Sequence, residues 1–171
     1  MTMSDMYHRY RRWFYLLIWL CIILILYLLL YPYIESRFNP NNKPSSAHVG
    51  NENVVILKAN STHSFVVSGK INGQQVVFLL DTGASMVAVP LPIAKKTGLN
   101  FGIPTQIITA SGTAKGYFTK INRLELGDIV LYNLPATITP ATPHNVVLLG
   151  MNALKTLEFT KRGNHLILKQ P

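Results

Sequence analysis

The chain has 171 residues and a formal net charge of +9 at pH 7, from 16 Lys and Arg against 7 Asp and Glu. Beyond residue 53 the basic residues stand singly, apart from Lys95-Lys96 and Lys161-Arg162, and do not alternate with aromatic residues. A solvated basic surface is therefore favoured, and we expect no nucleic-acid partner. The one cysteine, Cys21, excludes an intrachain disulfide framework and a cysteine-based metal cage. The 5 histidines lack the spacing of metal ligands, so we expect no metal and no cofactor.

A long apolar stretch follows a short basic tail, residues 1–12. Residues 13–34 contain no charged side chain, and aromatic residues stand at both ends of the stretch. Because about 20 residues cross a hydrocarbon core of ~30 Å, this stretch predicts a single transmembrane helix, which Pro32 would end. The stretch is longer than a usual signal-peptide core and lacks a small-residue cleavage pattern directly after it, which favours an uncleaved anchor.

The basic residues around this stretch predict its orientation. Arg9, Arg11 and Arg12 lie close before it, whereas Arg37 and Lys43 follow it. Because positive residues are retained on the cytoplasmic side, the denser cluster favours an N-terminus in the cytoplasm. We therefore expect a single-pass membrane protein whose C-terminal domain lies on the extracytoplasmic, periplasmic side.

Residues 35–53 differ in composition from the segments on either side. Asn, Pro and Ser dominate there, and few side chains could be buried in a core. We therefore predict a flexible linker, which would let the domain meet a second copy of itself. Such a linker is also a candidate for self-cleavage, because an unfolded segment can enter a peptide-binding cleft as an extended strand.

Residues 54–171 are enough for one domain with a core and too few for two. Short β-branched runs alternate there with turn signals such as Asn72-Gly73, which predicts a mostly β barrel or sandwich. One or two short helices are expected, over residues 90–97 and 151–156. The predicted strands are Val54–Lys58, His63–Ile71, Gln74–Leu80, Val87–Val89, Thr105–Thr109, Tyr117–Ile121, Arg123–Leu126, Ile129–Leu131, Val146–Leu149, Glu158–Thr160 and His165–Lys169.

An acidic residue stands at the end of one of these apolar strands. The predicted strand Gln74–Leu80 runs directly into the sequence Asp81-Thr82-Gly83-Ala84-Ser85. Asp and Gly are common turn residues, so this triplet alone also fits a purely structural turn. A second apolar element, Leu148-Leu149-Gly150, precedes the predicted helix over residues 151–156.

Together these segments resemble the retropepsin-like aspartic proteases, the single-lobe relatives of pepsin, and the resemblance spans about Val54 to Lys169. The triplet at residues 81–83 matches the catalytic triplet of that family, and the element at residues 148–150 resembles its apolar-apolar-Gly motif. Residues 107–118 resemble the flap hairpin that closes over substrate, with Ser111 and Gly112 near its tip. The apolar helix ahead of the domain is similar to that of membrane-anchored bacterial members.

The resemblance assigns roles to the residues of the triplet and its neighbours. Asp81 is the catalytic residue that it implies, and Thr82 would bond across a pair of such loops. Gly83 lets the chain turn tightly and brings N–H groups towards the carboxylate. Ala84 stands where pepsin-like enzymes usually carry Ser or Thr, and Ser85 stands where retroviral enzymes carry an acidic residue that binds the substrate backbone.

This chemistry needs a second carboxyl group, because one must deprotonate water while the other protonates the carbonyl. The chain has Asp only at Asp5, Asp81 and Asp128. Asp128 follows Gly127 and lacks Thr-Gly after it, so we interpret it as a turn residue. Residues 54–171 are also too few for the two lobes of pepsin. The second carboxylate is therefore expected from Asp81 of another copy, in a homodimer.

The function that these features favour is a membrane-anchored aspartic endopeptidase, active as a homodimer with one catalytic Asp per chain. Its expected partners are a second copy, a peptide or protein substrate, and the membrane. Two alternatives stay open. One is a retropepsin-fold dimerisation or binding module that does not cut. The other is an unrelated β-rich adaptor of the cell envelope, in which Asp81 is only a turn residue.

Overall fold

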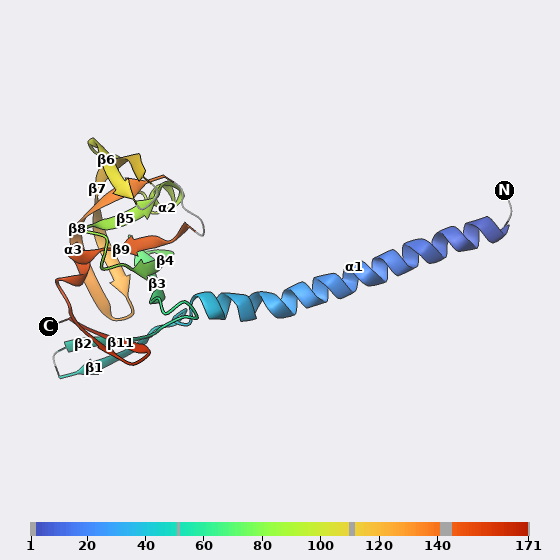
Figure 1. Ribbon diagram of the computed structural model, residues 1–171, viewed down its shortest axis with the longest axis horizontal. Helices are drawn as coiled ribbons and strands as arrows, with labels where there is room; N and C mark the ends of the chain where they lie inside the picture. Colours follow the sequence, from blue (N-terminus) through green and yellow to red (C-terminus); the bar gives the residue numbers. More distant parts are fainter. Residues whose placement is uncertain (1–2, 51, 110–111, 141–144, 171) are drawn as a thin grey trace. The chain divides into compact units, whose positions relative to one another are not determined.

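The computed structural model describes residues 3–50, 52–109, 112–140 and 145–170. The chain divides into two compact units, one ending at Arg37 and the other beginning at Phe38. The first unit is helical, and the second is built almost entirely of strands (Figure 1). The two units are described separately below.

The first unit is one helix, α1, which spans Met3–Phe38. Pro32 lies inside this helix, so the expectation that it ends the helix is wrong. Proline removes only one backbone bond of the ladder, and apolar helices tolerate that loss. Residues 13–38 are long and apolar enough to cross a membrane, which fits either a membrane span or a signal sequence.

The second unit contains the strands β1 to β11 and two short helices. The strands are β1 (Ser45–Val49), β2 (Glu52–Lys58), β3 (Val66–Ile71), β4 (Gln74–Leu80), β5 (Val87–Pro90), β6 (Pro104–Thr109), β7 (Gly112–Leu126), β8 (Ile129–Thr139), β9 (Val147–Leu149), β10 (Glu158–Arg162) and β11 (His165–Gln170). The helices are α2 (Leu91–Lys96) and α3 (Met151–Leu154). This confirms the prediction of a mostly β domain with short helices.

Seven of these strands form a sheet that curls back on itself. Its order is β3-β4-β9-β5-β8-β7-β6, and an additional pairing of β3 with β7 closes it. Gly69 permits this closure, because a Cβ at its position would overlap the Glu125 carbonyl oxygen. Inside, Phe78, Ile121 and Leu124 are fully buried. The closed β-barrel expected from the sequence is therefore present.

A second, four-stranded sheet has the order β1-β2-β11-β10. It joins residues from both ends of the domain, because β2 pairs with β11 over six residue pairs that run from His165↔Lys58 to Gln170↔Asn53. Leu57 and Leu168 of this sheet are fully buried. The β1–β2 hairpin and the β6–β7 hairpin lie at opposite ends of the domain (Figure 1).

Most described residues of the interval predicted as a flexible linker, residues 35–53, belong to a helix, a strand or a buried turn. Its first residues end α1, and its last residues form β1 and the start of β2. Between them, Asn41 is buried, and its side chain bonds the Lys58 N–H at 2.7 Å, the Lys58 carbonyl at 2.8 Å and the Val66 carbonyl at 2.7 Å. The domain therefore begins at Phe38 and not at Val54, because asparagine side chains replace the apolar contacts that the segment lacks.

The strand predicted from His63 also begins later than expected. The Asn60 side chain accepts hydrogen bonds from the N–H groups of Thr62 and Ser64, at 3.0 and 2.9 Å, which makes a local turn there. His63 has a φ of 61° within that turn, so it cannot continue a strand. β3 accordingly starts at Val66.

Candidate active site

The turn that carries the candidate carboxylate, residues 81–85, follows the end of β4 and is called the Asp81 turn below. The backbone N–H of Asp81 donates to the Leu149 carbonyl at 3.2 Å, which fixes the start of the turn against β9. The Gly83 N–H then donates to Oδ1 of Asp81 at 2.9 Å, and the Ala84 N–H donates to the Asp81 carbonyl at 3.2 Å. The carboxylate is thus held by its own turn while Asp81 stays partly exposed. Thr82, Gly83 and Ser85 are exposed beside it, so the turn is open to a second molecule.

The strand that leads into Asp81 and the apolar element Leu148-Leu149-Gly150 lie side by side. β4 pairs in parallel with β9, so Leu79 is opposite Leu148 and Leu80 is opposite Leu149. A Cβ at Gly150 would overlap the Met86 carbonyl and lie 2.8 Å from the Ala84 carbonyl oxygen. Gly150 is therefore required for the chain after β9 to pass this close to the Asp81 turn.

A residue that the sequence did not single out joins these segments. The Oδ1 of Asn152 accepts from the Val87 N–H at 2.9 Å, and its Nδ2 donates to the Pro135 carbonyl at 2.7 Å. The backbone N–H of Asn152 donates to the Ser85 carbonyl at 3.1 Å, next to the Met151 N–H, which donates to the Ala84 carbonyl at 2.8 Å. The start of α3 therefore holds the far end of the Asp81 turn. In the sequence, only its position two residues after Gly150 could have indicated that Asn152 has this structural role.

The hairpin that resembles a flap is formed by β6 and β7. Their register runs from Pro104↔Tyr117 to Thr109↔Gly112. Gly112 has a φ of 117°, a conformation that favours glycine, and Ser111 lies outside the described residues. Ile108 is 89% exposed, so this hairpin presents an apolar side chain that the domain itself does not cover.

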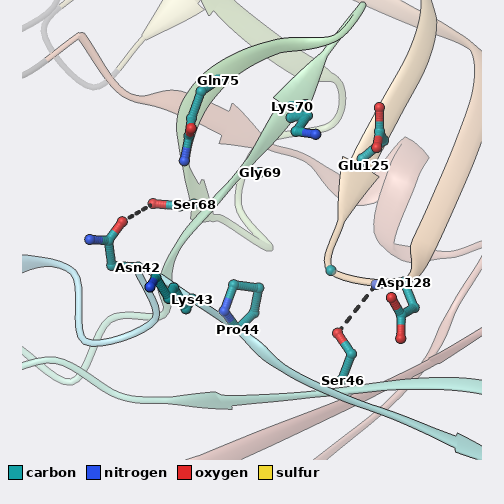
Figure 2. A pocket seen from close by; sticks show the side chains of 11 residues that line it. Asn42, Lys43, Pro44, Ser46, Ser68, Gly69, Lys70, Gln75, Glu125 and Asp128 are labelled. Carbon is teal, nitrogen blue, oxygen red and sulfur yellow. Dashed lines mark hydrogen bonds between the residues drawn. The ribbon is translucent and has the colours of Figure 1, made fainter.

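Asp128 lies in the turn between β7 and β8, as its sequence context indicated. Its backbone N–H donates to Oγ of Ser46 at 3.2 Å, and its Oδ2 lies 3.6 Å from Nε2 of His48. This turn lies at the edge of a pocket of about 370 Å³, which Figure 2 shows from close by. The pocket is lined by Asn42, Lys43, Pro44, Ser46, Ser68, Gly69, Lys70, Gln75, Glu125, Gly127 and Asp128. Asp81 and its turn are not part of that lining.

Metal-ligating side chains do not gather at this turn. Among the described residues, no group of three or more His, Cys, Asp and Glu side chains is placed to hold a metal ion. The chemical groups at the turn are the Asp81 carboxylate, the backbone N–H of Gly83 and the hydroxyls of Thr82 and Ser85. A carboxylate in such a setting can take a proton from a bound water and can give that proton back.

Comparison with known proteins identifies the family. Residues 67–156 match the family described as "gag-polyprotein putative aspartyl protease", and this range contains both the Asp81 turn and Gly150. The chain belongs to this family. It is a family of retropepsin-like aspartic proteases, so the resemblance seen in the sequence is confirmed.

Individual proteins are also similar to this chain. The chain is 32% identical over 113 residues to an uncharacterized protein in the cobV 5′ region of Sinorhizobium sp, a match that covers 64% of this chain and 48% of that protein. A retropepsin-like aspartic protease from Rickettsia conorii has 25% sequence identity and a TM-score of 0.60, with coverage of 75% of this chain and 96% of that one. The EIAV protease in complex with the inhibitor HBY-793 has 18% identity and a TM-score of 0.44, over 53% of this chain and 84% of that one.

Proposed function

We propose that this protein is an aspartic endopeptidase that hydrolyses peptide bonds through a water activated by Asp81. The observation that carries the proposal is the Asp81 turn, in a chain of the retropepsin-like family. A hydrogen bond from the Gly83 N–H to Oδ1 fixes the direction of the carboxylate. Because Asp81 is partly exposed, a water and a peptide carbonyl can reach it.

One such carboxylate is half of the required chemistry. A base must take a proton from water while an acid gives one to the carbonyl oxygen, and two close carboxyl groups sharing one proton supply both. Within the described part of the domain the other Asp is Asp128, whose carboxylate faces His48 and is not part of the Asp81 turn. The proposed active form is therefore a homodimer in which each copy contributes Asp81.

The neighbours of Asp81 have proposed supporting roles. Thr82 is exposed, which suits a hydroxyl that bonds across two loops in a dimer, and Ser85 is exposed beside the turn, where its hydroxyl could bond a substrate main chain. Ala84 adds no hydroxyl to the pair of carboxyl groups. The β6–β7 hairpin, with Gly112 and Ser111 near its tip, is proposed to close over an extended peptide with apolar side chains.

The helix α1 is proposed to anchor the enzyme in a membrane over residues 13–34. A run of this length and hydropathy spans a bilayer without leaving backbone groups unbonded. The cluster of Arg9, Arg11 and Arg12 supports a domain on the extracytoplasmic side. A reporter that is active only in the periplasm, fused after the C-terminus, should then be active, whereas activity of a cytosol-dependent reporter there would reverse the orientation.

The peptidase proposal is tested by incubating the purified full chain in detergent with a peptide library. The wild type should cleave extended peptides with apolar side chains at the cut, and Asp81→Asn should not, because two amides can neither deprotonate water nor share a proton. Asp128→Asn is the matched control and should keep the activity, since it makes the same chemical change in the β7–β8 turn. An active Asp81→Asn protein would refute the mechanism. A folded wild type that binds peptides without cutting them would favour the non-catalytic module.

A further inference from the structure

One end of the four-stranded sheet carries a row of exposed basic side chains. Lys58 of β2 is opposite His165 of β11, and His165 is opposite Arg162 of β10. Directly opposite residues direct their side chains to the same face of a sheet, and all three of these residues are exposed. In the next row Leu57 and Leu166 are buried, so their side chains point to the core and the neighbouring row points outward. Lys58, His165 and Arg162 are called the basic row below.

The domain does not neutralise the charges of the basic row. Among the described residues, neither Lys58 nor Arg162 makes an ion pair. The stretches 58–65 and 160–165 contain no Asp or Glu. Lys161, which is also exposed, adds a third cation next to Arg162. An uncompensated positive surface of this kind attracts anionic groups.

The other end of the same sheet is different. Both acidic residues of its four strands are there, Glu52 at the start of β2 and Glu158 at the start of β10. Nζ of Lys169 lies 3.2 Å from Oε2 of Glu52, and Lys169 is opposite Glu158 in the register of β10 and β11. The positive charge of the sheet is therefore concentrated at the basic row.

Hydrogen bonds hold the basic row beside the residue at which the apolar helix ends. Phe38 is the last residue of α1 and the first of the second unit. Its carbonyl accepts from Nδ2 of Asn60 at 3.2 Å. The N–H of Ala59 donates to the carbonyl of Asn164 at 2.8 Å, which joins the end of β2 to the β10–β11 turn. Lys58 directly precedes Ala59 in the chain, so the basic row is near Phe38.

The stretch that is long and apolar enough to cross a membrane, Trp13–Phe38, also ends at Phe38. Its 26 residues make a helix about 39 Å long, which exceeds the ~30 Å hydrocarbon core, so a spanning helix would end among the lipid headgroups. We propose that the basic row docks on the phosphate groups of anionic phospholipids at that level. Basic residues next to a span attract anionic lipids, and Arg162 can bond a phosphate with two N–H groups.

The membrane is favoured over other polyanions because the chain itself brings it to this surface. Attraction between exposed charges extends only about 8 Å at physiological ionic strength, so it requires a partner held close by. The bond between Asn60 and the Phe38 carbonyl provides that proximity. The docking rests on the proposed membrane anchor, but not on peptide cleavage or on the side of the membrane. Asp81→Asn should therefore leave it unchanged.

Fluorescence quenching from the bilayer surface tests the docking in the full chain. The chain is reconstituted into nanodiscs of phosphatidylcholine, alone or mixed with phosphatidylglycerol, each with the same fraction of a lipid that carries a nitroxide on its headgroup. In a Cys21→Ser background, Asn164→Cys carries a bimane label in the exposed β10–β11 turn. The nitroxide should quench this label more strongly in the discs that contain phosphatidylglycerol. High salt should remove the difference, because the screening length falls from about 10 Å at 0.1 M to about 3 Å at 1 M.

Charge reversal of the basic row is the decisive variant. Lys58→Glu with Arg162→Glu should lower the ratio of docked to undocked domain about tenfold or more and remove the effect of phosphatidylglycerol. Lys115→Glu with Lys120→Glu is the matched control, since it makes the same change at exposed residues of β7 and should keep the effect. Lys58→Arg with Arg162→Lys should also keep the effect, because lipid attraction follows charge. That exchange separates docking from a structural role of the two side chains.

Three results would overturn the proposal. An acidic protein or a nucleic acid as the true partner would give equal quenching in both kinds of nanodisc. Equal loss of the phosphatidylglycerol effect in the control pair would show a response to net charge and not a docking surface. A chain that enters nanodiscs of neither composition would refute the anchor together with the docking, whereas a chain that enters them without the lipid effect would refute the docking alone.

Discussion

Asn152 offers the sharpest test of how the Asp81 turn is held. Its side chain accepts from the Val87 N–H at 2.9 Å and donates to the Pro135 carbonyl at 2.7 Å. Val87 is 0% exposed, so Asn152→Ala leaves a buried backbone donor without its acceptor. Pro135 is exposed, and its carbonyl can bond water instead. The loss is therefore that of one buried unsatisfied group, about 1–3 kcal/mol of the free energy of unfolding.

The measurement must follow the domain and not the helix. Both tryptophans, Trp13 and Trp19, lie in α1, so tryptophan fluorescence would report on that helix. Circular dichroism of the strand signal during urea or thermal unfolding is suitable, and a domain of this size should lose roughly 3–5 °C of Tm for each kcal/mol. Asn100→Ala is the control, because Asn100 is exposed and changes of that kind stay within about 0.5 kcal/mol.

Two outcomes would contradict this reasoning. If the free energy of unfolding of Asn152→Ala lies within about 0.5 kcal/mol of the wild-type value, the Val87 N–H does not need this side chain as its hydrogen-bond acceptor. If it lowers stability but leaves cleavage unchanged, α3 does not position the Asp81 turn. The expected result is a loss of both, because without the side-chain bonds to Val87 and Pro135 the backbone of residue 152, whose N–H donates to the Ser85 carbonyl, is no longer held in place.

Two glycine substitutions test the close approaches that build the barrel and the site. Gly150→Ala should lower both the cleavage rate and the Tm, because the added Cβ would overlap backbone atoms at Ala84 and Met86, and overpacking of this kind costs about 1–3 kcal/mol. Unchanged activity would show that the turn does not need this contact. Gly69→Ala should lower the Tm by more than Gly73→Ala, because its Cβ would overlap a carbonyl oxygen of β7, whereas at Gly73 nothing lies within 4 Å of a Cβ and only the positive φ of 81° opposes a side chain.

Local sequence signals were sufficient for most of the strands. The Asn72-Gly73 turn lies between strands whose register, Ile71↔Gln74, is that of the expected hairpin, and both its residues have positive φ. The predicted and observed bounds of β4 agree, because a continuous apolar run ends at an acidic turn residue. The position of Asp81 beside Gly150 could be expected only from the family resemblance, since the parallel pairing of β4 with β9 joins segments that are far apart in the sequence.

Side-chain hydrogen bonds over long sequence separations could not be predicted. Asn152 was not singled out because nothing local distinguishes an Asn that bonds Val87 from an exposed one. The segment of residues 35–53 was predicted to be a linker for the same reason. Its low apolar content is real, but Asn39 and Asn41 are buried, and Asn39 donates to Oγ of Ser68 at 2.9 Å. Composition measures how much a segment can bury by the hydrophobic effect and does not count such bonds.

The order of this segment changes the expectation for self-cleavage. A peptide must be extended and free of its own sheet to enter a cleft, yet β1 pairs with β2 over five residue pairs, and Asn41 bonds the backbone of Lys58 and Val66. If the proposed peptidase releases its own domain, local opening of residues 39–49 should limit the rate.

Asn41→Ala should then speed the appearance of a shorter fragment, measured by mass spectrometry on the full chain in detergent. Asp81→Asn in the same background should abolish that fragment, and equal fragment yield from both would assign the cut to another protease. If Asn41→Ala instead leaves the cleavage rate of the active enzyme unchanged, these buried bonds do not protect the segment.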